Sequence, residues 1–272
     1  MEASDGPSSE EQPEVKRREA YDTDLSDEQW ELIAPLLERT ETRGKKREVD
    51  MREVVNGMLY QTRTGCQWRM IPHDFGVHWS VIRYYFDTWR HDGTFQHIND
   101  FLRRCVRRTI GRQEEPSAGS IDSQSAKTTE AGGLRGYNGG KKGNRRKRQI
   151  LVDTEGFLLR VWVHEADLYD GDGGRILLEV ALPDFPRLAK LWADSHYSNL
   201  VAWLHKRFGV ELEIVSQLAD QKGFVVLPRR WVVERTFAWL GRSRRLSKEY
   251  ERDTSSTEAF IYISSIHLVS PQ

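Results

Sequence analysis

Residues 227–240 read LPRRWVVERTFAWL and give the clearest indication of how the chain folds. Pro228 suits the entry to a helix because its ring fixes φ and it has no backbone N–H, and the apolar residues after it recur with a helical period. Glu234 shares a face of this helix with three apolar neighbours about one turn away, Trp231, Phe237 and Ala238. A carboxylate on an apolar face needs a positive partner, since burying it alone is costly. That partner is either Arg230, one turn back, or a metal ion shared with other acids.

The composition is that of a chain able to bury a real core, either as one large domain or as two small ones, in 272 residues. Only Cys66 and Cys105 are present, which excludes a disulfide framework and disfavours a cysteine-rich zinc site. The apolar runs are short, which argues against a membrane span, and the N-terminus lacks the pattern of a signal peptide. We therefore expect a cytoplasmic protein in a reducing compartment.

The formal charge is zero, but the charges are segregated along the chain. Acidic residues crowd the N-terminus, whereas basic residues gather in residues 103–112, 141–148 and 229–245. One such run is typical of a solvated surface. Three of them favour a polyanionic partner, because salt confines each local field to about 10 Å and a neutral chain can still bind phosphate locally.

The first part of the chain predicts helices. Residues 1–20 have no apolar period and indicate a disordered extension. Order begins near residue 25, where Ser26 and Gln29 form a predicted capping box ahead of a helix, and a second helix is expected at about residues 51–64.

Residues 65–89 predict a turn and then a further helix that exposes Arg83 and Tyr84. A helix, a turn and a second helix of this kind is the layout of a helix-turn-helix, whose second helix enters a DNA major groove. An ordinary helical bundle predicts the same pattern, so both interpretations stay open. A connecting helix is expected at about residues 95–110.

After Pro116 the pattern changes from helical to mixed, which places a domain boundary between residues 21–115 and residues 116–272. The later part predicts, in order, three strands, a helix, a strand, a helix, a strand and a final helix. This is the order of a ribonuclease-H-like fold. The expected class is therefore α/β, a ribonuclease-H-like mixed five-stranded sheet with helices, preceded by an all-α helix-turn-helix-type domain.

Three acids lie on or at the end of predicted strands and helices, where an active site can form. Asp122 lies in the first predicted strand, Asp194 ends the fourth, and Glu234 lies on the last helix. Adjacent first and fourth strands would bring the two aspartates together, and three convergent carboxylates suit Mg²⁺. Taken singly, Asp122 could cap a strand end, Asp194 could form a turn, and Glu234 could pair with Arg230.

Three blocks of sequence resemble bacterial insertion-sequence transposases of the DDE class. They are residues 121–128 (IDSQSAKT), Trp192-Ala193-Asp194, and residues 222–224 (KGF) running through residues 231–240 (WVVERTFAWL). The resemblance extends from about Tyr21 to near the C-terminus. It implies that Asp122, Asp194 and Glu234 are the catalytic triad, with spacings of 194 − 122 = 72 and 234 − 194 = 40 residues. It also implies two bound Mg²⁺ or Mn²⁺ ions and a ribonuclease-H-like domain behind an N-terminal DNA-binding domain.

Some positions depart from the pattern of the family. Gln149 stands where relatives commonly carry a histidine, and His196 stands where they often carry a glycine. The basic residues expected to contact the DNA backbone, which positions a duplex without reading its sequence, are Lys141, Lys142, Arg146, Lys147, Arg148, Arg230 and Arg242.

The expected function is a transposase that binds the double-stranded ends of its own element, cleaves them and joins the freed 3′-OH to target DNA. We expect it to act as a homodimer or larger assembly on DNA, associated with the nucleoid. Two alternatives are a non-catalytic DNA-binding protein derived from a transposase and a nuclease of the same fold.

Overall fold

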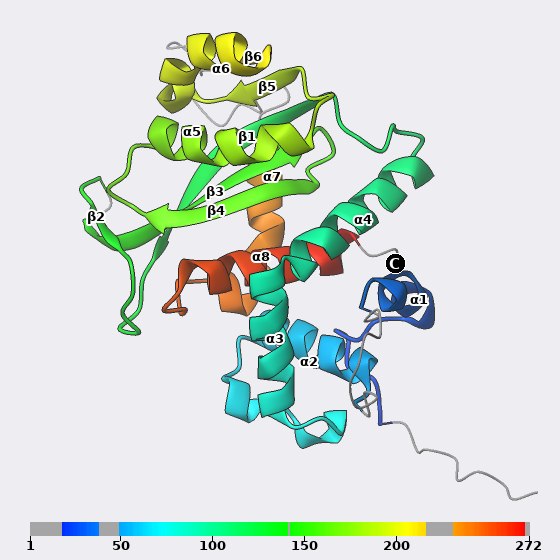
Figure 1. Ribbon diagram of the computed structural model, residues 1–272. Helices are drawn as coiled ribbons and strands as arrows, with labels where there is room; N and C mark the ends of the chain where they lie inside the picture. Colours follow the sequence, from blue (N-terminus) through cyan, green and yellow to red (C-terminus); the bar gives the residue numbers. More distant parts are fainter. Residues whose placement is uncertain (1–17, 38–48, 141, 216–230, 270–272) are drawn as a thin grey trace, which may run out of the picture.

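The computed structural model describes residues 18–37, 49–140, 142–215 and 231–269, and it shows a mixed α/β architecture (Figure 1). The described chain opens with the helices α1 (Asp27–Leu37), α2 (Met51–Thr64), α3 (Trp79–Asp92) and α4 (Thr94–Thr109). Two short 3-10 turns, η1 (Trp68–Met70) and η2 (His73–Phe75), lie between α2 and α3.

The predicted capping box at the start of α1 is confirmed. The Ser26 backbone N–H donates to Gln29 Oε1 at 2.9 Å, and the Gln29 N–H donates to Ser26 Oγ at 3.2 Å. The second helix also has the predicted bounds: the Asp50 side chain accepts from the first backbone N–H groups of α2, and Gly65 ends the helix in a left-handed conformation. Local capping signals therefore fix the first helices well.

The sheet contains β1 (Ala118–Lys127), β2 (Gly136–Asn138), β3 (Gly143–Asp153), β4 (Leu158–Glu165), β5 (Lys190–Ala193) and β6 (Glu211–Ile214). The order is β2-β3-β1-β5-β6, and β4 also pairs with β3. Strand β3 is antiparallel to β1, β2 and β4, whereas β1, β5 and β6 run parallel to one another. The expected ribonuclease-H-like mixed sheet is confirmed, with one addition: the short strand β2, which lies in a glycine-rich segment that carries no strand pattern.

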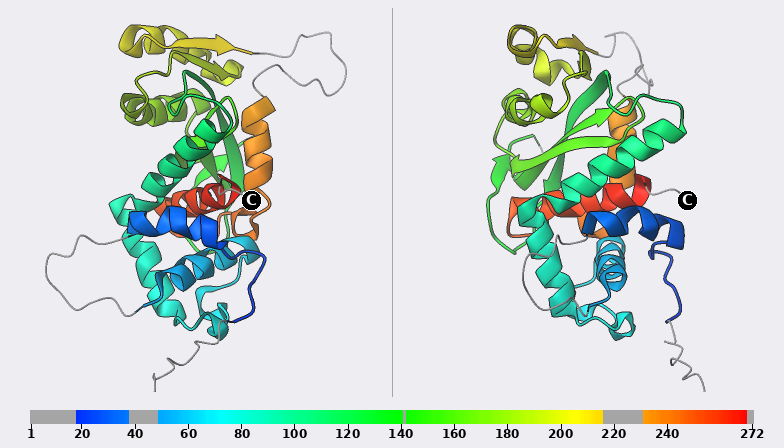
Figure 2. Two further views of the ribbon diagram at one scale, coloured as in Figure 1. Left: turned by 90° about the vertical axis from the view of Figure 1, so that its right-hand side faces the viewer. Right: turned by 45° about the vertical axis from the view of Figure 1, so that its right-hand side comes forward.

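Helices cover both faces of the sheet (Figure 2). On one face lie α5 (Asp170–Ala181), the 3-10 turns η3 (Leu182–Asp184) and η4 (Ser195–Leu200), and α6 (Val201–Phe208). On the other face lie α4, α7 (Trp231–Leu240) and α8 (Thr254–Val269), with the turn η5 (Arg244–Leu246) between the last two helices. Alternate residues of β3 point to the two faces of the sheet. Leu151 packs on the face covered by α5 and α6, and Ile150 on the face covered by α7 and α8.

Helix α8 lies between the sheet and the N-terminal helices α2 and α3 (Figure 1). Most of its residues are buried, around its whole circumference, and it contacts α4 and β4 as well. The predicted list of elements did not include this helix. One hydrophobic core therefore joins the first four helices to α7, α8 and one face of the sheet.

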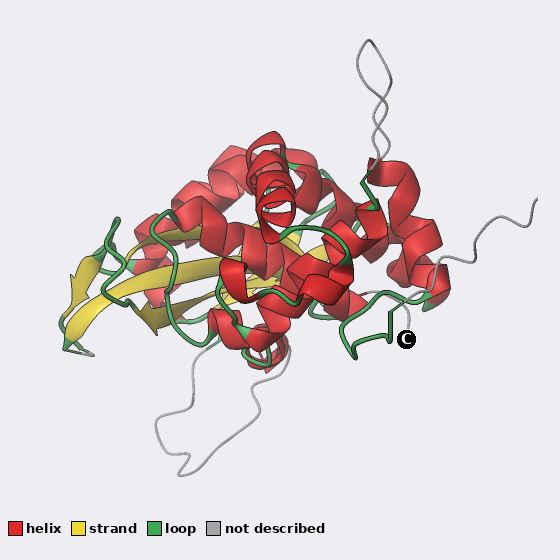
Figure 3. Cartoon of the chain, turned by 90° about the horizontal axis from the view of Figure 1, so that it is seen from below, coloured by secondary structure: helices red, strands yellow, loops and turns green. Residues whose placement is uncertain are grey.

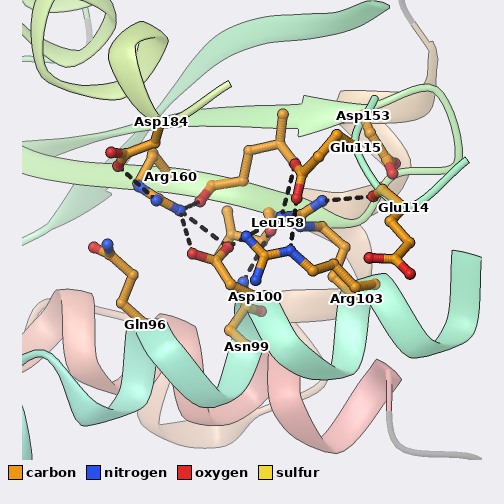
Figure 4. A network of polar contacts seen from close by, with 12 residues as sticks. Gln96, Asn99, Asp100, Arg103, Glu114, Glu115, Asp153, Leu158, Arg160 and Asp184 are labelled. Atoms are coloured by element: carbon orange, nitrogen blue, oxygen red, sulfur yellow. Dashed lines mark hydrogen bonds and ion pairs between the residues drawn. The ribbon is translucent and has the colours of Figure 1, made fainter. Parts of the chain in front are cut away.

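A buried polar network joins α4 to the sheet (Figure 4). Asp100 accepts from Arg160 at 3.0 Å and lies 3.4 Å from Arg103, whose side chain is fully buried. Arg107 pairs with Asp153, a carboxyl group whose pKa is raised by burial although the arginine opposes the shift. Two of the arginines in the predicted basic run at residues 103–112 thus face inward, because they neutralise buried carboxylates.

Candidate active site

Asp122 and Asp194 belong to neighbouring parallel strands. The register pairs Ser120 of β1 with Trp192 of β5, an offset of 192 − 120 = 72 residues. Asp122 and Asp194 are separated by the same 194 − 122 = 72 residues, so continuing the register by two positions sets them opposite each other. Adjacent strands lie about 4.8 Å apart, and residues opposite each other point to the same face. The strand register thus brings the two predicted aspartates together, and both are half-buried.

The hydroxyl of Tyr197 is buried near both aspartates. Burial raises the pKa of Tyr197 well above its usual value, and the negative charges of Asp122, Asp170 and Asp194 raise it further. Three carboxylates therefore lie within electrostatic range of one hydroxyl. Because it stays protonated, this hydroxyl donates a hydrogen bond, which it makes to Gln149 Oε1 at 2.7 Å.

Asp194 is held by the turn that follows β5. Its side chain caps η4, accepting from the backbone N–H of His196 at 2.8 Å, and its other oxygen lies 3.0 Å from His196 Nδ1. The hydrogen bond to Asp194 raises the pKa of His196. The residue that replaces the family's common glycine thus contacts the aspartate directly.

Asp170, in the first turn of α5, is a fourth acid near this site. It accepts from Ser123 Oγ at 2.6 Å and from Lys147 Nζ at 3.1 Å, which ties the start of α5 to β1 and β3. The glycines that follow Asp170 in the sequence could have indicated that α5 packs closely at this point. A Cβ on Gly174 would lie 2.6 Å from the Tyr197 ring. Close packing of α5 on η4 requires a glycine there.

Glu234 lies on α7, on the face of the sheet that Asp122 and Ile150 share. Burial of its helix face is confirmed for Phe237 but wrong for the rest: Glu234 and Ala238 are exposed, and Trp231 is 38% exposed. The other buried residues of α7 are Val232, Val233, Thr236 and Leu240. The Arg235 guanidinium lies 4.4 Å from the ring centres of both Trp231 and Trp239, so both rings make cation–π contacts with it.

Within the described residues, no group of three or more His, Cys, Asp or Glu side chains is arranged to hold a metal ion. The structure thus brings together Asp122 and Asp194 but does not set Glu234 in one ligand group with them. Two half-buried carboxylates, one within β1 and one directly after the neighbouring strand β5, still fit the chemistry of a hard divalent cation, which prefers oxygen ligands.

Three of the basic residues expected to contact DNA lie in the interior. Arg146 is fully buried and donates to the carbonyl oxygens of Leu134, Glu251 and Arg252. Arg148 bonds to Glu249, and Lys147 to Asp170. The expected phosphate contacts of Arg146, Lys147 and Arg148 therefore have to be revised, because these groups already serve the protein's own oxygens.

The other predicted DNA contacts are more accessible. Tyr84 is 61% exposed on α3, and Arg83 beside it pairs with Asp87 at 2.6 Å. Lys142 and Arg242 are exposed. The two remaining residues, Lys141 and Arg230, lie outside the described residues.

A mixed sheet of this order, with one aspartate in β1 and another directly after the neighbouring strand β5, defines the ribonuclease-H-like class of domain. Residues 113–269 match the family described as the transposase DDE domain, and residues 25–99 match a family described as transposases of the IS4/5 family. The first match spans more than half of the chain, which therefore belongs to the DDE transposase family.

A similar curated protein is an insertion element IS402 uncharacterized 16.2 kDa protein from Burkholderia cepacia. It is 28% identical over 117 residues, which cover 40% of this chain and 76% of that protein. The DDE transposase domain implies a DNA-cleaving enzyme that binds DNA, and such enzymes generally use divalent metal ions. In the described part of the chain, no helix has both the length and the apolar character needed to span a membrane.

Proposed function

We propose that this transposase binds the ends of its own insertion element, hydrolyses a phosphodiester bond at each end and transfers the freed 3′-OH to target DNA. The observation that carries the proposal is the shared offset of 72 residues between the β1–β5 register and the Asp122–Asp194 pair. It supports a site in which the two acids lie side by side, Asp122 within β1 and Asp194 directly after β5. An element has two ends, so the active assembly is a homodimer or larger on DNA at the nucleoid.

Asp122 and Asp194 would hold Mg²⁺ or Mn²⁺, and Glu234 would complete the ligand set from α7. Two such ions, when bound, activate the attacking oxygen and stabilise the leaving oxygen in an in-line displacement at phosphorus. The protein's own residues supply the positioning. Gln149 holds Tyr197, which anchors the turn that begins at Asp194, and Ser123 holds Asp170 beside β1. Lys142, Arg83, Tyr84 and Arg242, with Lys141 and Arg230, would position the duplex.

The test compares Asp122→Asn, Asp194→Asn and Glu234→Gln with the wild type in an assay containing Mg²⁺, DNA that carries an element end and a target plasmid. Each variant should lose cleavage while it keeps end binding. Asp172→Asn is the matched control, since Asp172 is exposed in the first turn of α5, and it should cleave normally. Full cleavage by the Glu234 variant would disprove the triad but leave the aspartate pair standing.

The products separate the alternatives. Joined products support a transposase, cleavage without joining indicates a nuclease of the same fold, and binding alone indicates a non-catalytic DNA-binding protein. Full cleavage by either aspartate variant would remove the basis of the proposal.

A further inference from the structure

A groove of about 730 Å³ lies where β1 and β3 extend past the helices, against the segment that follows η5. Figure 3 shows the strands running beyond the helical part at this end. Three basic side chains line the groove, together with a single acid, Glu130. The three bases are Lys127, Arg135 and Lys248.

The wall of this groove is built on a buried charge cluster. Glu249 is buried and lies 2.5 Å from Arg148 and 3.7 Å from Arg146. Its backbone oxygen accepts from the N–H of Thr129 at 3.1 Å, and it forms a parallel bridge with Thr128. The inward arginines of the basic run thus fix the segment that carries Lys248 against the ribbon that carries Lys127.

The lining bases themselves are available to a ligand. Lys127, Arg135 and Lys248 are all exposed, and none of them forms an ion pair with an acid among the residues that the structure describes. Three bases against one acid on a preorganised surface create a positive local field that attracts a polyanion. Since Lys and Arg donors serve phosphate oxygens, the charge favours a nucleic acid backbone.

The distance between Asp122 and Lys127 along β1 indicates which part of the DNA would lie at the groove. Lys127 follows Asp122 by 127 − 122 = 5 residues on the same extended strand, which corresponds to about 17 Å at about 3.4 Å per residue. Successive phosphates of a B-DNA strand rise by about 3.4 Å. An odd separation points the side chains of Asp122 and Lys127 to opposite faces of β1. Lys248 lies level with Lys127, because the N–H of its neighbour Glu249 donates to the Lys127 carbonyl oxygen, and Glu249 pairs with Arg148 on the face that Ile150 and Asp122 share. A duplex that lies along this face from the aspartates therefore reaches the groove, at Lys248, after about five base pairs.

We propose that the groove formed by Lys127, Arg135 and Lys248 binds the phosphate backbone of the duplex about five base pairs from the phosphate that is cleaved at Asp122 and Asp194. The location of the cleaved phosphate rests on the proposed function, whereas the basic groove itself does not. The ligand is duplex DNA next to the cleavage point, and the contact is independent of base sequence.

The first experiment measures salt dependence. A fluorescein-labelled duplex that carries the element's terminal repeat is titrated with wild-type protein and with the triple variant Lys127→Gln/Arg135→Gln/Lys248→Gln at several KCl concentrations. Each lost phosphate contact lowers the slope of log affinity against log salt by about 0.9, so the triple variant should lose about 2 to 3 units of slope. The control is Arg175→Gln/Lys206→Gln/Arg207→Gln, which removes three exposed bases from α5 and α6 and should keep the wild-type slope.

The second experiment locates the contact. Phosphates are replaced one at a time by uncharged methylphosphonates. Replacements about five base pairs from the cleavage point should weaken binding by wild-type protein but not by the triple variant. An unchanged slope in the triple variant, or an equal effect of these replacements on both proteins, would overturn the proposal. Failure of the proposed function is a separate result, because it appears as cleavage by the aspartate variants. Unchanged circular dichroism confirms that the variants fold.

Discussion

Replacing Glu249 with alanine should strongly destabilise the protein. Glu249 is buried, accepts from Arg148 Nε and from Thr257 Oγ1 at 2.7 Å, and lies 3.7 Å from the buried Arg146. Removing one partner of a buried charge group leaves the others uncompensated, which costs about 3–5 kcal/mol. For a chain of this size, such a loss lowers the melting temperature by about 6 to 20 °C.

Urea unfolding followed by tryptophan fluorescence measures this loss. Glu249→Gln is the first control: it preserves the shape and one carbonyl oxygen acceptor, so the free energy of unfolding should fall by less. Glu211→Ala is the second, since the Glu211 side chain is 65% exposed and pairs with Lys190 at 3.0 Å, and such a surface pair contributes about 0–1 kcal/mol. A Glu249→Ala protein within about 1 kcal/mol of the wild type would show that the arginines are satisfied by carbonyl oxygens alone.

Three further changes test the interior. Burial raises the pKa of Glu258 above its ordinary value of 4.5, so the wild type loses stability as the pH rises from that value through the shifted pKa. Glu258→Gln should therefore gain stability relative to the wild type over this rise, and a difference in urea unfolding that stays constant with pH would refute this. Tyr197→Phe removes the hydroxyl that donates to Gln149 and should cost about 1–3 kcal/mol in the same assay; a neutral result would mean that water replaces the donor. Gly174→Ala should cost about 1–3 kcal/mol through overpacking, whereas Gly139→Ala, with open space around it, should be neutral, and equal melting temperatures would contradict the packing.

The pairing of Asp122 with Asp194 could be predicted because it depends only on which strands are neighbours. Both strands carry a local β pattern, and their order follows from the alternation of strands and helices. The register itself comes from the structure, in which the strand offset equals the residue spacing of 72. A short-range signal was equally informative at Ser26, where the capping side chain lies next to the helix that it starts.

Helix α8 could not be predicted in the same way. A helix on the surface shows its period because one side is apolar and the other polar. Most of α8 is buried between the sheet and the N-terminal helices, and small polar residues such as Ser264 and Ser265 lie inside with the apolar ones. Their hydroxyls bond to Ser243 and Asn99, so their burial depends on distant partners that a local pattern does not reveal.

The basic run at residues 141–148 was misinterpreted for a related reason. A run of arginines on a strand looks like a polar surface, but the partners that make Arg146 and Arg148 internal are Glu249 and carbonyl oxygens of the chain about 100 residues later. Charge counting along the sequence therefore does not distinguish basic side chains that serve the protein's own oxygens from those that are exposed. The exposed bases of the groove, Lys127 and Lys248, are single residues outside that run.

For α7 the sequence predicted the helix correctly but not which of its residues face the core. The predicted stripe took Trp231 as an inward anchor, while the structure buries Val232 and Val233 and lets Arg235 stack against the tryptophan rings. Tryptophan combines an apolar body with a polar edge, so its presence does not decide which side of a helix faces the core. The consequence for Glu234 is direct. An exposed carboxylate carries no large desolvation cost, so the buried ion pair with Arg230 is not needed to explain it, and a ligand that approaches α7 from outside can reach it.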